Sequence, residues 1–452
     1  MKKLIYKIII VAAAILSLSS CSLYRQYERP KLHYVDSLYR RLPDLQDSSS
    51  IAELSWREFF ADTTLQEWIR LGISFNTDLS VARIKVEQAQ ATLYAARKAF
   101  LPSASLSAEA GTALKGGELS TSYSLAPSFS WEADIFGRMT NAKRSAMAAL
   151  EQSVAYKQAV QTQLIATIAE TYYTLLMLDA QLAINQRTQK TWEENIRTLE
   201  ALKMAGKTNE AAVLQAKANM LDVQSSIYVL HKQIFETENA FSSLIGIVPI
   251  IIDRGTLDDQ EFVTRLSGGL PAEILSNRPD VRQAELQLMQ AFYATNQARA
   301  AFYPSVKLDG FMRFDPSGFI ADLGALLLQP LYARGANKAQ LRKAEAQQKI
   351  ALYQFRQKLL EAGVEVNNAL VSLKTAQSMV KIDKRQIVHL QAAVWNTQLL
   401  MKHGNTNYLE VLTAQQKLLK AELSEISDRY EEIRSVINLY HALGGGYKND
   451  EE

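Results

Sequence analysis

The residue types that most often carry catalysis or hold metal ions are few and scattered in this sequence. Its five histidines, at positions 33, 231, 389, 403 and 441, do not follow the spacing of a metal-binding motif. The sequence also has no phosphate-binding P-loop, no Gly-x-Ser-x-Gly nucleophile turn and no zinc-binding helix motif. We therefore predict that the protein is not an enzyme, has no catalytic residues and uses neither a metal nor a cofactor.

The single cysteine lies where covalent lipid attachment is the expected chemistry. Three lysines within the first seven residues precede an apolar run over 8–18, which is too short for a comfortable membrane span and is typical of a signal peptide. The Leu-Ser-Ser-Cys stretch that ends at Cys21 resembles a bacterial lipoprotein box, in which cleavage before the cysteine is followed by lipidation. Ser22 favours sorting to the outer membrane. A buried free thiol is the alternative.

Composition excludes several classes of protein. The chain has 452 residues, of which 48% are hydrophobic, and a net charge of only +3. That apolar content can bury a core, so disorder is excluded. Acidic and basic residues alternate without a basic block, so a nucleic-acid partner is not expected. A lone cysteine excludes a disulfide framework.

Proline and glycine positions predict unusually long helices. The ten prolines leave residues 128–248 and 331–452 without any, and no glycine occurs between Gly137 and Gly206. Proline interrupts helix interiors, so long helices are the natural use of such tracts. A continuous helix over this glycine-free interval would reach roughly 100 Å.

The two halves of the chain look like copies of one plan. Around the expected helix turns, identical residues recur 198 positions later: Leu202, Gly206, Thr208, Asn209, Val213 and Leu214 as Leu400, Gly404, Thr406, Asn407, Val411 and Leu412. Phe100, Pro102 and Ser103 recur as Phe302, Pro304 and Ser305. Each half is predicted to contain a helix, two short strands, a very long helix, a Gly-x-Thr-Asn turn and a return helix.

The second long helix carries a seven-residue repeat of apolar positions. One column is Leu359, Val366, Leu373, Val380, Ile387 and Val394, and the other is Ala362, Ala369, Ala376, Asp383 and Leu390. This repeat predicts coiled-coil packing, and the alanines allow neighbouring helices to approach closely. We interpret the columns as helix core and not as a ligand site.

After each Phe-x-Pro-Ser segment the pattern changes to strict alternation. Leu106 and Ala108 alternate with serines and Glu109, and Val306 and Leu308 alternate with Lys307 and Asp309. Such segments of about ten residues are typical of transmembrane β-strands, although a soluble hairpin on a core shows the same pattern. Four strands cannot close a barrel, because about eight is the practical minimum, so subunits would have to share it. Three chains would supply twelve strands.

Several motifs taken together show a resemblance that covers almost the whole mature chain. The chain resembles the outer-membrane factors, the TolC-like efflux lipoproteins. The motifs are Tyr27-Glu28-Arg29-Pro30, Trp56-Arg57-Glu58-Phe59-Phe60-Ala61-Asp62, Asn76-Thr77-Asp78-Leu79, Trp131-Glu132-Ala133-Asp134-Ile135-Phe136-Gly137-Arg138, Asn277-Arg278-Pro279-Asp280-Val281-Arg282-Gln283-Ala284-Glu285, Ala300-Ala301-Phe302-Tyr303-Pro304-Ser305 and Tyr440-His441-Ala442-Leu443-Gly444-Gly445-Gly446-Tyr447.

The resemblance implies a fold, partners and a location. The expected fold is mainly α, with coiled-coil hairpins forming a periplasmic α-barrel tunnel and four strands per chain contributing to a trimeric 12-stranded β-barrel. The implied partners are two further copies, a periplasmic adaptor protein, an inner-membrane pump of the RND type and outer-membrane lipid. The expected location is the outer membrane of a Gram-negative bacterium.

Three groups of residues are candidates for the site. By resemblance, the periplasmic aperture corresponds to Leu409, Glu410 and Thr413, where Thr413 replaces a common aspartate; a solvated helix face is the alternative for Glu410. The helix turns at Gly206, Thr208, Asn209, Gly404, Thr406 and Asn407 are the candidate adaptor contacts. Charged strand residues are candidates for the barrel lumen, because charges that face lipid are costly: Glu109, Lys307, Asp309, Arg313 and Asp322. Arg138 and Arg334 are candidates for positioning the strand-to-helix joints, with plain solvation as the alternative.

The expected organisation is as follows. Residues 1–20 form the signal peptide, 21–62 a lipidated extended segment and 444–452 a tail. The first repeat, 63–260, has strands at about 103–131, a long helix at 138–205 and a return helix at 209–245. The second repeat, 261–443, has a helix at 271–301, strands at 304–330, a long helix at 336–403 and a return helix at 407–443.

The leading hypothesis for function is a passive outer-membrane duct in a tripartite efflux system that exports drugs or other small molecules. Within the same class, the duct could serve type I protein secretion or heavy-metal efflux. From a different class, the chain could be an anchored periplasmic coiled-coil scaffold.

Overall fold

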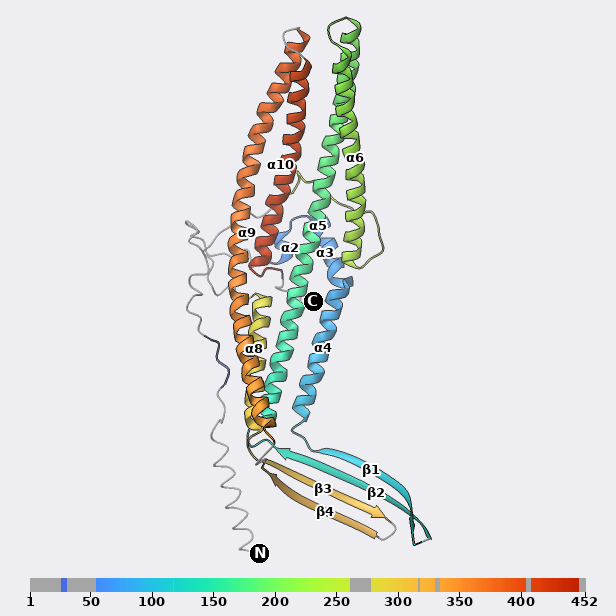
Figure 1. Cartoon of the computed structure of the whole chain (residues 1–452), viewed down its shortest axis with the longest axis vertical. Helices are drawn as coiled ribbons and strands as arrows, with labels where there is room; N and C mark the ends of the chain where they lie inside the picture. Colours follow the sequence, from blue (N-terminus) through green and yellow to red (C-terminus); the bar gives the residue numbers. More distant parts are fainter. Residues whose placement is uncertain are drawn as a thin grey trace. The chain divides into compact units, whose positions relative to one another are not determined.

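The computed structural model describes residues 26–30, 54–116, 118–260, 278–315, 318–329, 334–403 and 408–446. Within these ranges the chain is mainly helical, with one four-stranded sheet (Figure 1). The mainly α fold class with a small membrane-type sheet, predicted from proline placement and periodicity, is confirmed. No helix in the described ranges has the length and apolar character needed to cross a membrane.

Two very long helices, each of 67 residues, dominate the fold. They are α5 (Arg138–Met204) and α9 (Ala336–Lys402), and each is followed by a return helix, α6 (Glu210–Ile245) or α10 (Tyr408–Ala442). At 1.5 Å per residue, α5 and α9 are each roughly 100 Å long. The shorter helices are α2 (Trp56–Phe59), α3 (Thr63–Phe75), α4 (Thr77–Lys98) and α8 (Pro279–Ala300).

The predicted heptad columns of α9 form helix core. Leu359, Val366, Leu373 and Val380 are 3%, 0%, 1% and 6% exposed, and the alanine column between them is also buried. Further along, Ile387 and Val394 are only half-buried. The seam is therefore tightest between Leu359 and Val380, in the middle of α9, where the alanines let the neighbouring backbone approach.

The chain forms two compact units that cut across the two sequence repeats. Among the described residues, the strand-bearing unit lies within 83–156 and 280–358, and the helical unit within 54–82, 157–260, 278–279, 359–403 and 408–446. Each unit thus takes equivalent pieces from both halves of the chain. The two repeats are therefore visible in the sequence, but each compact unit of the folded chain combines segments from both repeats.

The sheet is antiparallel with strand order β1-β2-β3-β4 (Figure 1). Its strands are β1 (Ser103–Lys115), β2 (Glu118–Ala133), β3 (Ser305–Asp315) and β4 (Gly318–Leu328). The central pairing joins the two halves of the chain, with Phe129 opposite Gly310 and Trp131 opposite Leu308.

Several family-like motifs meet in the core of the helical unit. The Tyr440 ring stacks on Phe59 with centroids 4.0 Å apart, and its hydroxyl donates to the Leu54 carbonyl at 2.9 Å. A Cβ on Gly445 would lie only 2.3 Å from the Tyr440 ring, so the triple-glycine end is needed for close approach. Asp62 caps α3 and accepts a hydrogen bond from the Tyr172 hydroxyl at 2.8 Å. These motifs therefore stabilise joints between elements.

Candidate channel wall and helix tips

One face of the sheet carries all five charged residues that the alternation pattern singled out. Opposite residues in an antiparallel pair point to the same face, and the register places Ser130 opposite Asp309 and Glu132 opposite Lys307. The same face continues through the Phe311–Asp322 pair into β4. By alternation, it holds the five candidates: Glu109, Lys307, Asp309, Arg313 and Asp322. The register thus groups charges from β1, β3 and β4.

The opposite face of the sheet is apolar. Apart from the Thr112–Thr121 pair, its residues are apolar: Ala104, Leu106, Ala108, Ala110, Leu114, Tyr123, Leu125, Pro127, Phe129, Trp131, Ala133, Val306, Leu308, Gly310, Met312, Phe314, Phe319, Ala321, Leu323, Ala325 and Leu327. Large side chains on this face are exposed, including Leu106 at 66% and Leu323 at 73%. A face this apolar and this exposed is suited to lipid.

Both outer strands of the sheet have an open edge in the described chain. The strand order leaves β1 and β4 each with a single neighbour, and every described residue of β4 is exposed. Unpaired backbone groups cannot remain in lipid, where no water is available to satisfy them. The sheet therefore requires additional strands for a membrane location.

Charged side chains line two hollows on the polar face. Glu109 and Arg313 both line an open hollow of about 810 Å³. Asp309 and Asp322 line a second hollow, of about 390 Å³, together with serines of β1 and β2. The first hollow therefore holds both signs of charge, whereas the second holds acidic charges alone.

The strand-to-helix joint at the start of α5 is fixed by four side chains. The Trp131 indole donates to the Phe100 carbonyl at 2.9 Å, and Arg138 forms a two-pronged ion pair with Glu132 at 2.8 Å. Asp134 accepts hydrogen bonds from the backbone N–H groups of Met139 and Thr140 and so caps the helix. Arg138 therefore contacts the joint, which was one of its two predicted roles. For Arg334, the structure gives only a left-handed backbone, with φ of 49°.

The first helix tip is built by the residues that the sequence singled out. Gly206 has φ of +67°, which favours glycine, and a Cβ added there would meet nothing within 4 Å. The Asn209 side chain accepts from the Ala212 N–H at 3.0 Å and caps α6. Thr208 is half-buried between them. The tip is thus a defined turn with an open surface.

The second tip is described only from its flanks. Gly404, Thr406 and Asn407 lie outside the described residues. Beyond them, the three aperture candidates, Leu409, Glu410 and Thr413, are all exposed on the first turns of α10. The Thr413 hydroxyl donates to the Leu409 carbonyl at 2.8 Å. Val411 and Leu412 between them are buried, so they fix which side of α10 faces outward.

Leu412 anchors the start of α10 against the first helix hairpin. It packs in a buried cluster with Trp192 and Leu199 of α5 and with Val213 and Ala216 of α6. One turn further on, the Asn195 side-chain amide of α5 donates to Gln415 of α10 at 2.9 Å. The aperture candidates are therefore held by contacts with the other half of the chain.

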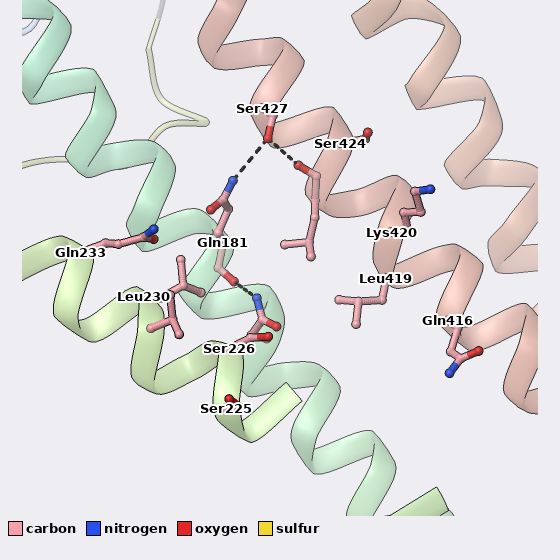
Figure 2. A pocket seen from close by; sticks show the side chains of 13 residues that line it. Gln181, Ser225, Ser226, Leu230, Gln233, Gln416, Leu419, Lys420, Ser424 and Ser427 are labelled. Atoms are coloured by element: carbon pink, nitrogen blue, oxygen red, sulfur yellow. Dashed lines mark hydrogen bonds between the residues drawn. The ribbon is translucent and has the colours of Figure 1, made fainter. Parts of the chain in front are cut away.

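A polar groove between the two hairpins was not predicted from the sequence. Figure 2 shows this pocket of about 620 Å³, which α5, α6 and α10 line together. The Gln181 amide donates to the Ser427 hydroxyl at 3.3 Å, and Ser427 donates to the Leu423 carbonyl at 3.0 Å. Small polar residues on the coiled-coil helices, namely Ser225, Ser226 and Ser424, could have indicated this groove in the sequence. Only the three-dimensional arrangement brings them to one groove.

Two further predictions concern the lipid anchor and metal binding. Cys21 lies outside the described residues, so its lipidation stays a prediction. Among the described residues, no group of three or more His, Cys, Asp or Glu side chains is arranged to hold a metal ion.

Comparison with known proteins agrees with this geometry. The family model described as outer membrane efflux protein matches residues 68–247 and 270–445, one match in each half. The chain belongs to the outer membrane efflux protein family. The internal duplication and the resemblance drawn from the motifs are thereby confirmed, and so is the outer membrane of a Gram-negative bacterium as the location of this efflux protein.

Individual relatives support the same conclusion over the full length. The chain is 28% identical to the cation efflux system protein CusC of Escherichia coli O6:H1, over 96% of this chain and 97% of that protein. It is also 28% identical to the toluene efflux pump outer membrane protein TtgF of Pseudomonas putida, over 96% and 95%.

Solved structures match the fold equally well. The crystal structure of CusC superposes with a TM-score of 0.85 at 26% identity, covering 94% of this chain and 100% of that chain. The MtrE outer membrane channel of Neisseria gonorrhoeae, in its open state, superposes with a TM-score of 0.84 at 28% identity, covering 96% and 100%. The efflux protein described here is thus an outer-membrane efflux channel; its relatives are transport proteins and not enzymes.

Proposed function

We propose that three copies of this chain form a channel-tunnel that passively conducts small molecules out of the cell. The main supporting observation is the sheet, which has one charged face, one apolar face and two open edges. Three copies would supply twelve strands, pair every edge and turn the apolar face to lipid and the charged face to a lumen. The long helices would extend this lumen as a tunnel.

Exposed apolar residues on α6 support packing between copies. Leu214, Leu221, Tyr228 and Phe235 recur every seven residues, and each is more than half exposed in the single chain, at 57%, 58%, 68% and 64%. A heptad column of this kind is typical of helix-on-helix packing. A neighbouring copy would bury it.

The remaining assignments follow from position. Cys21 would anchor each copy to outer-membrane lipid after lipidation. Glu410, repeated by threefold symmetry, would form a carboxylate ring at the periplasmic aperture. A periplasmic adaptor protein would contact three places: the exposed first tip, the corresponding residues 404–407 and the polar groove. The adaptor would connect the duct to an inner-membrane pump, which we expect to be of the RND type.

Conductance separates a duct from a scaffold. The purified full-length protein is reconstituted into planar lipid bilayers, and steps of ionic current are recorded. A duct gives discrete conductance steps, whereas a coiled-coil scaffold with a soluble sheet gives none. Absence of conductance in a preparation shown to contain assembled trimers would refute the proposal.

For substrate, we propose organic small molecules, with metal cations and secreted proteins as alternatives. The names of the relatives CusC and TtgF refer to cation efflux and to toluene efflux. The charged sheet face has both signs, which favours an unselective wall and leaves selection to the pump. A deletion strain that becomes sensitive to salts of metal cations, but not to organic solvents and dyes, would favour the cation alternative.

A further inference from the structure

The alanine column of α9 is interrupted by a buried aspartate. Asp383 takes the position that follows Ala362, Ala369 and Ala376 in the seven-residue repeat, and it is only 9% exposed. Its Oδ2 atom is buried and has no hydrogen-bond donor. A carboxylate in this position is costly unless something compensates for the lost water.

Asp428 of α10 lies opposite this aspartate. The two residues are nearly equidistant from Lys402 and Tyr408, where α9 ends and α10 begins, so an antiparallel hairpin brings them together. Their carboxyl groups are within hydrogen-bonding reach of each other. Two ionised carboxylates only accept hydrogen bonds, so this contact needs one proton between them.

The charges around the pair are mainly acidic. Glu425 and Glu431 on α10 face Asp428, and Asp258, from the segment before 260, faces Glu425. Burial, the hydrogen bond with Asp383 and these negative charges raise the pKa of Asp428 to about 6. Burial likewise raises the pKa of Glu425, although Lys384 and Arg429 oppose the rise.

The nearby cations have other partners or act on Glu425. Arg429 pairs with Glu432 at 2.6 Å and donates to the Gln260 carbonyl at 3.0 Å. Lys384 of α9 acts on Glu425. The facing side of α5 contributes neutral contacts, from Gln181 to Ser427 and from Thr174 to Tyr430, and two ion pairs, Arg187–Glu422 and Arg434–Glu170. None of the ion pairs among the described residues includes Asp383 or Asp428.

We propose that Asp383 and Asp428 form a proton-sharing carboxyl pair that makes the packing of the α9–α10 hairpin sensitive to pH. With one proton, the pair is a hydrogen bond between the buried Asp383 and the partly buried Asp428. Without it, two like charges face each other where the alanine column requires close approach. The proposal concerns a single chain and does not depend on the trimer.

A proton fits this pair better than a metal ion does. Divalent cations in proteins take several oxygen ligands, and the described residues contain no group of three or more candidate ligands in position. The pair has only two carboxyl groups and lies in a seam of alanines. Added divalent cations distinguish a metal site from a shared proton.

The direction of the pH effect follows from the raised pKa. An aspartate in the unfolded chain has a pKa of about 3.9. Between that value and about 6, the folded hairpin holds a proton that the unfolded chain does not, so stability falls as pH rises through this window. Above about 6 the effect is complete, and the hairpin is at its loosest.

The test compares Asp428→Asn, Asp383→Asn and the double variant with the parent protein in detergent. The thermal unfolding midpoint is measured from pH 4.5 to 8. We expect the midpoint of the parent to fall by several degrees between about pH 4.5 and 7, and this fall to be mostly absent from each single variant. The double variant should add little, because the two residues act as one unit. Asp222→Asn, which removes an exposed carboxylate from α6, should behave like the parent.

Infrared spectroscopy detects the protonated carboxyl group directly. The infrared band of protonated carboxyl groups should contain a component in the parent that is present at pH 5 and weakens near pH 6, and the Asp428→Asn variant should lack this component. An unchanged pH profile in both single variants would overturn the proposal. So would stabilisation by Mg²⁺, Ca²⁺ or Zn²⁺ at pH 7.5 that Asp428→Asn abolishes, because the pair would then be a cation site.

Discussion

At the scale of single residues, the family-like motifs act mainly as structural joints. Arg278 is almost fully buried, donates to the Ala442 carbonyl at the end of α10 at 2.7 Å and pairs with Glu365 of α9 at 2.6 Å. The His441 Nδ1 atom lies 3.5 Å from the same carboxylate. One arginine thus ties the start of the second repeat to its end.

Replacing Arg278 with alanine should strongly destabilise the helical unit. Arg278 is only 4% exposed, although its partner Glu365 is 43% exposed, and its removal also leaves the Ala442 carbonyl without its donor, so the expected loss is about 1–3 kcal/mol. Thermal unfolding of the purified protein measures the effect as a lower midpoint. Arg434→Ala is the matched control, because that arginine is 46% exposed in its ion pairs and such pairs contribute about 0–1 kcal/mol. Equal losses for both variants would contradict this role.

The same joint predicts a loss of stability in acid. Burial raises the pKa of Glu365, but hydrogen bonds and charge from His441 and Arg278 outweigh it, so the pKa is lowered overall. A lowered pKa stabilises the folded state above the ordinary glutamate value of about 4.3 and loses that contribution as pH falls through the folded value. Glu365→Gln should therefore be less stable than the parent at pH 7, and the difference should disappear in strong acid. A constant difference at every pH would exclude this linkage.

Glu410 is the residue through which ion selectivity can be tested. It is exposed at the start of α10, as is Thr413, the position at which the family resemblance implies a second acidic residue. A ring of carboxylates attracts cations, so Glu410→Gln should lower the cation preference in reversal-potential measurements under a salt gradient. Thr413→Asp should raise it. Unchanged selectivity and leak in both variants would show that Glu410 is only a solvated helix residue.

At the scale of elements, the sequence predicts what local rules determine and misses what long-range pairing determines. The long helices were predictable because proline and glycine are absent, and the strands because apolar residues alternate. The pairing of β2 with β3, such as Trp131 with Leu308, joins distant parts of the chain and has no local signal. The Asn195–Gln415 contact and the groove in Figure 2 were missed for the same reason. Asp383 was visible in the heptad column, but its partner was not.

Neighbouring positions on β4 provide a matched test of the two sheet faces. Leu323 lies on the apolar face and Asp322 on the charged face, both near the middle of the strand. Arginine on a lipid-facing position near the bilayer midplane costs about 2–4 kcal/mol, whereas a lumen position tolerates charge. Leu323→Arg should therefore reduce the amount of assembled outer-membrane protein, and Asp322→Arg should leave it near the parent level. Assembly is measured on unboiled gels, and the reverse order of effects would invert the assignment of the faces.

At the scale of the whole molecule, the open edges of the sheet make a prediction about how many chains assemble. Cys21 is the only cysteine, and its thiol would be consumed by lipidation, so an introduced cysteine pair can be cross-linked without background. With Ala108→Cys on β1 and Ala325→Cys on β4, each placed on the apolar face of an outer strand, a closed ring lets every copy join its neighbour. Flexible bis-maleimide linkers should then give covalent dimers and trimers and nothing larger, because a closed ring of three has no free edge.

A second cysteine pair separates contacts between copies from contacts within one. Leu125 of β2 and Phe314 of β3 are direct partners in the same chain, so cysteines at these positions should cross-link within the monomer and give no ladder. If the cysteine pair on the outer strands yields only monomers, the sheet edges of neighbouring copies do not meet. If it yields cross-linked products larger than trimers, the assembly is open. Either result would refute a twelve-stranded barrel, even if the protein conducts as expected of a duct. The need to pair the open edges is the physical reason for proposing three copies, and this experiment measures directly whether those edges are paired.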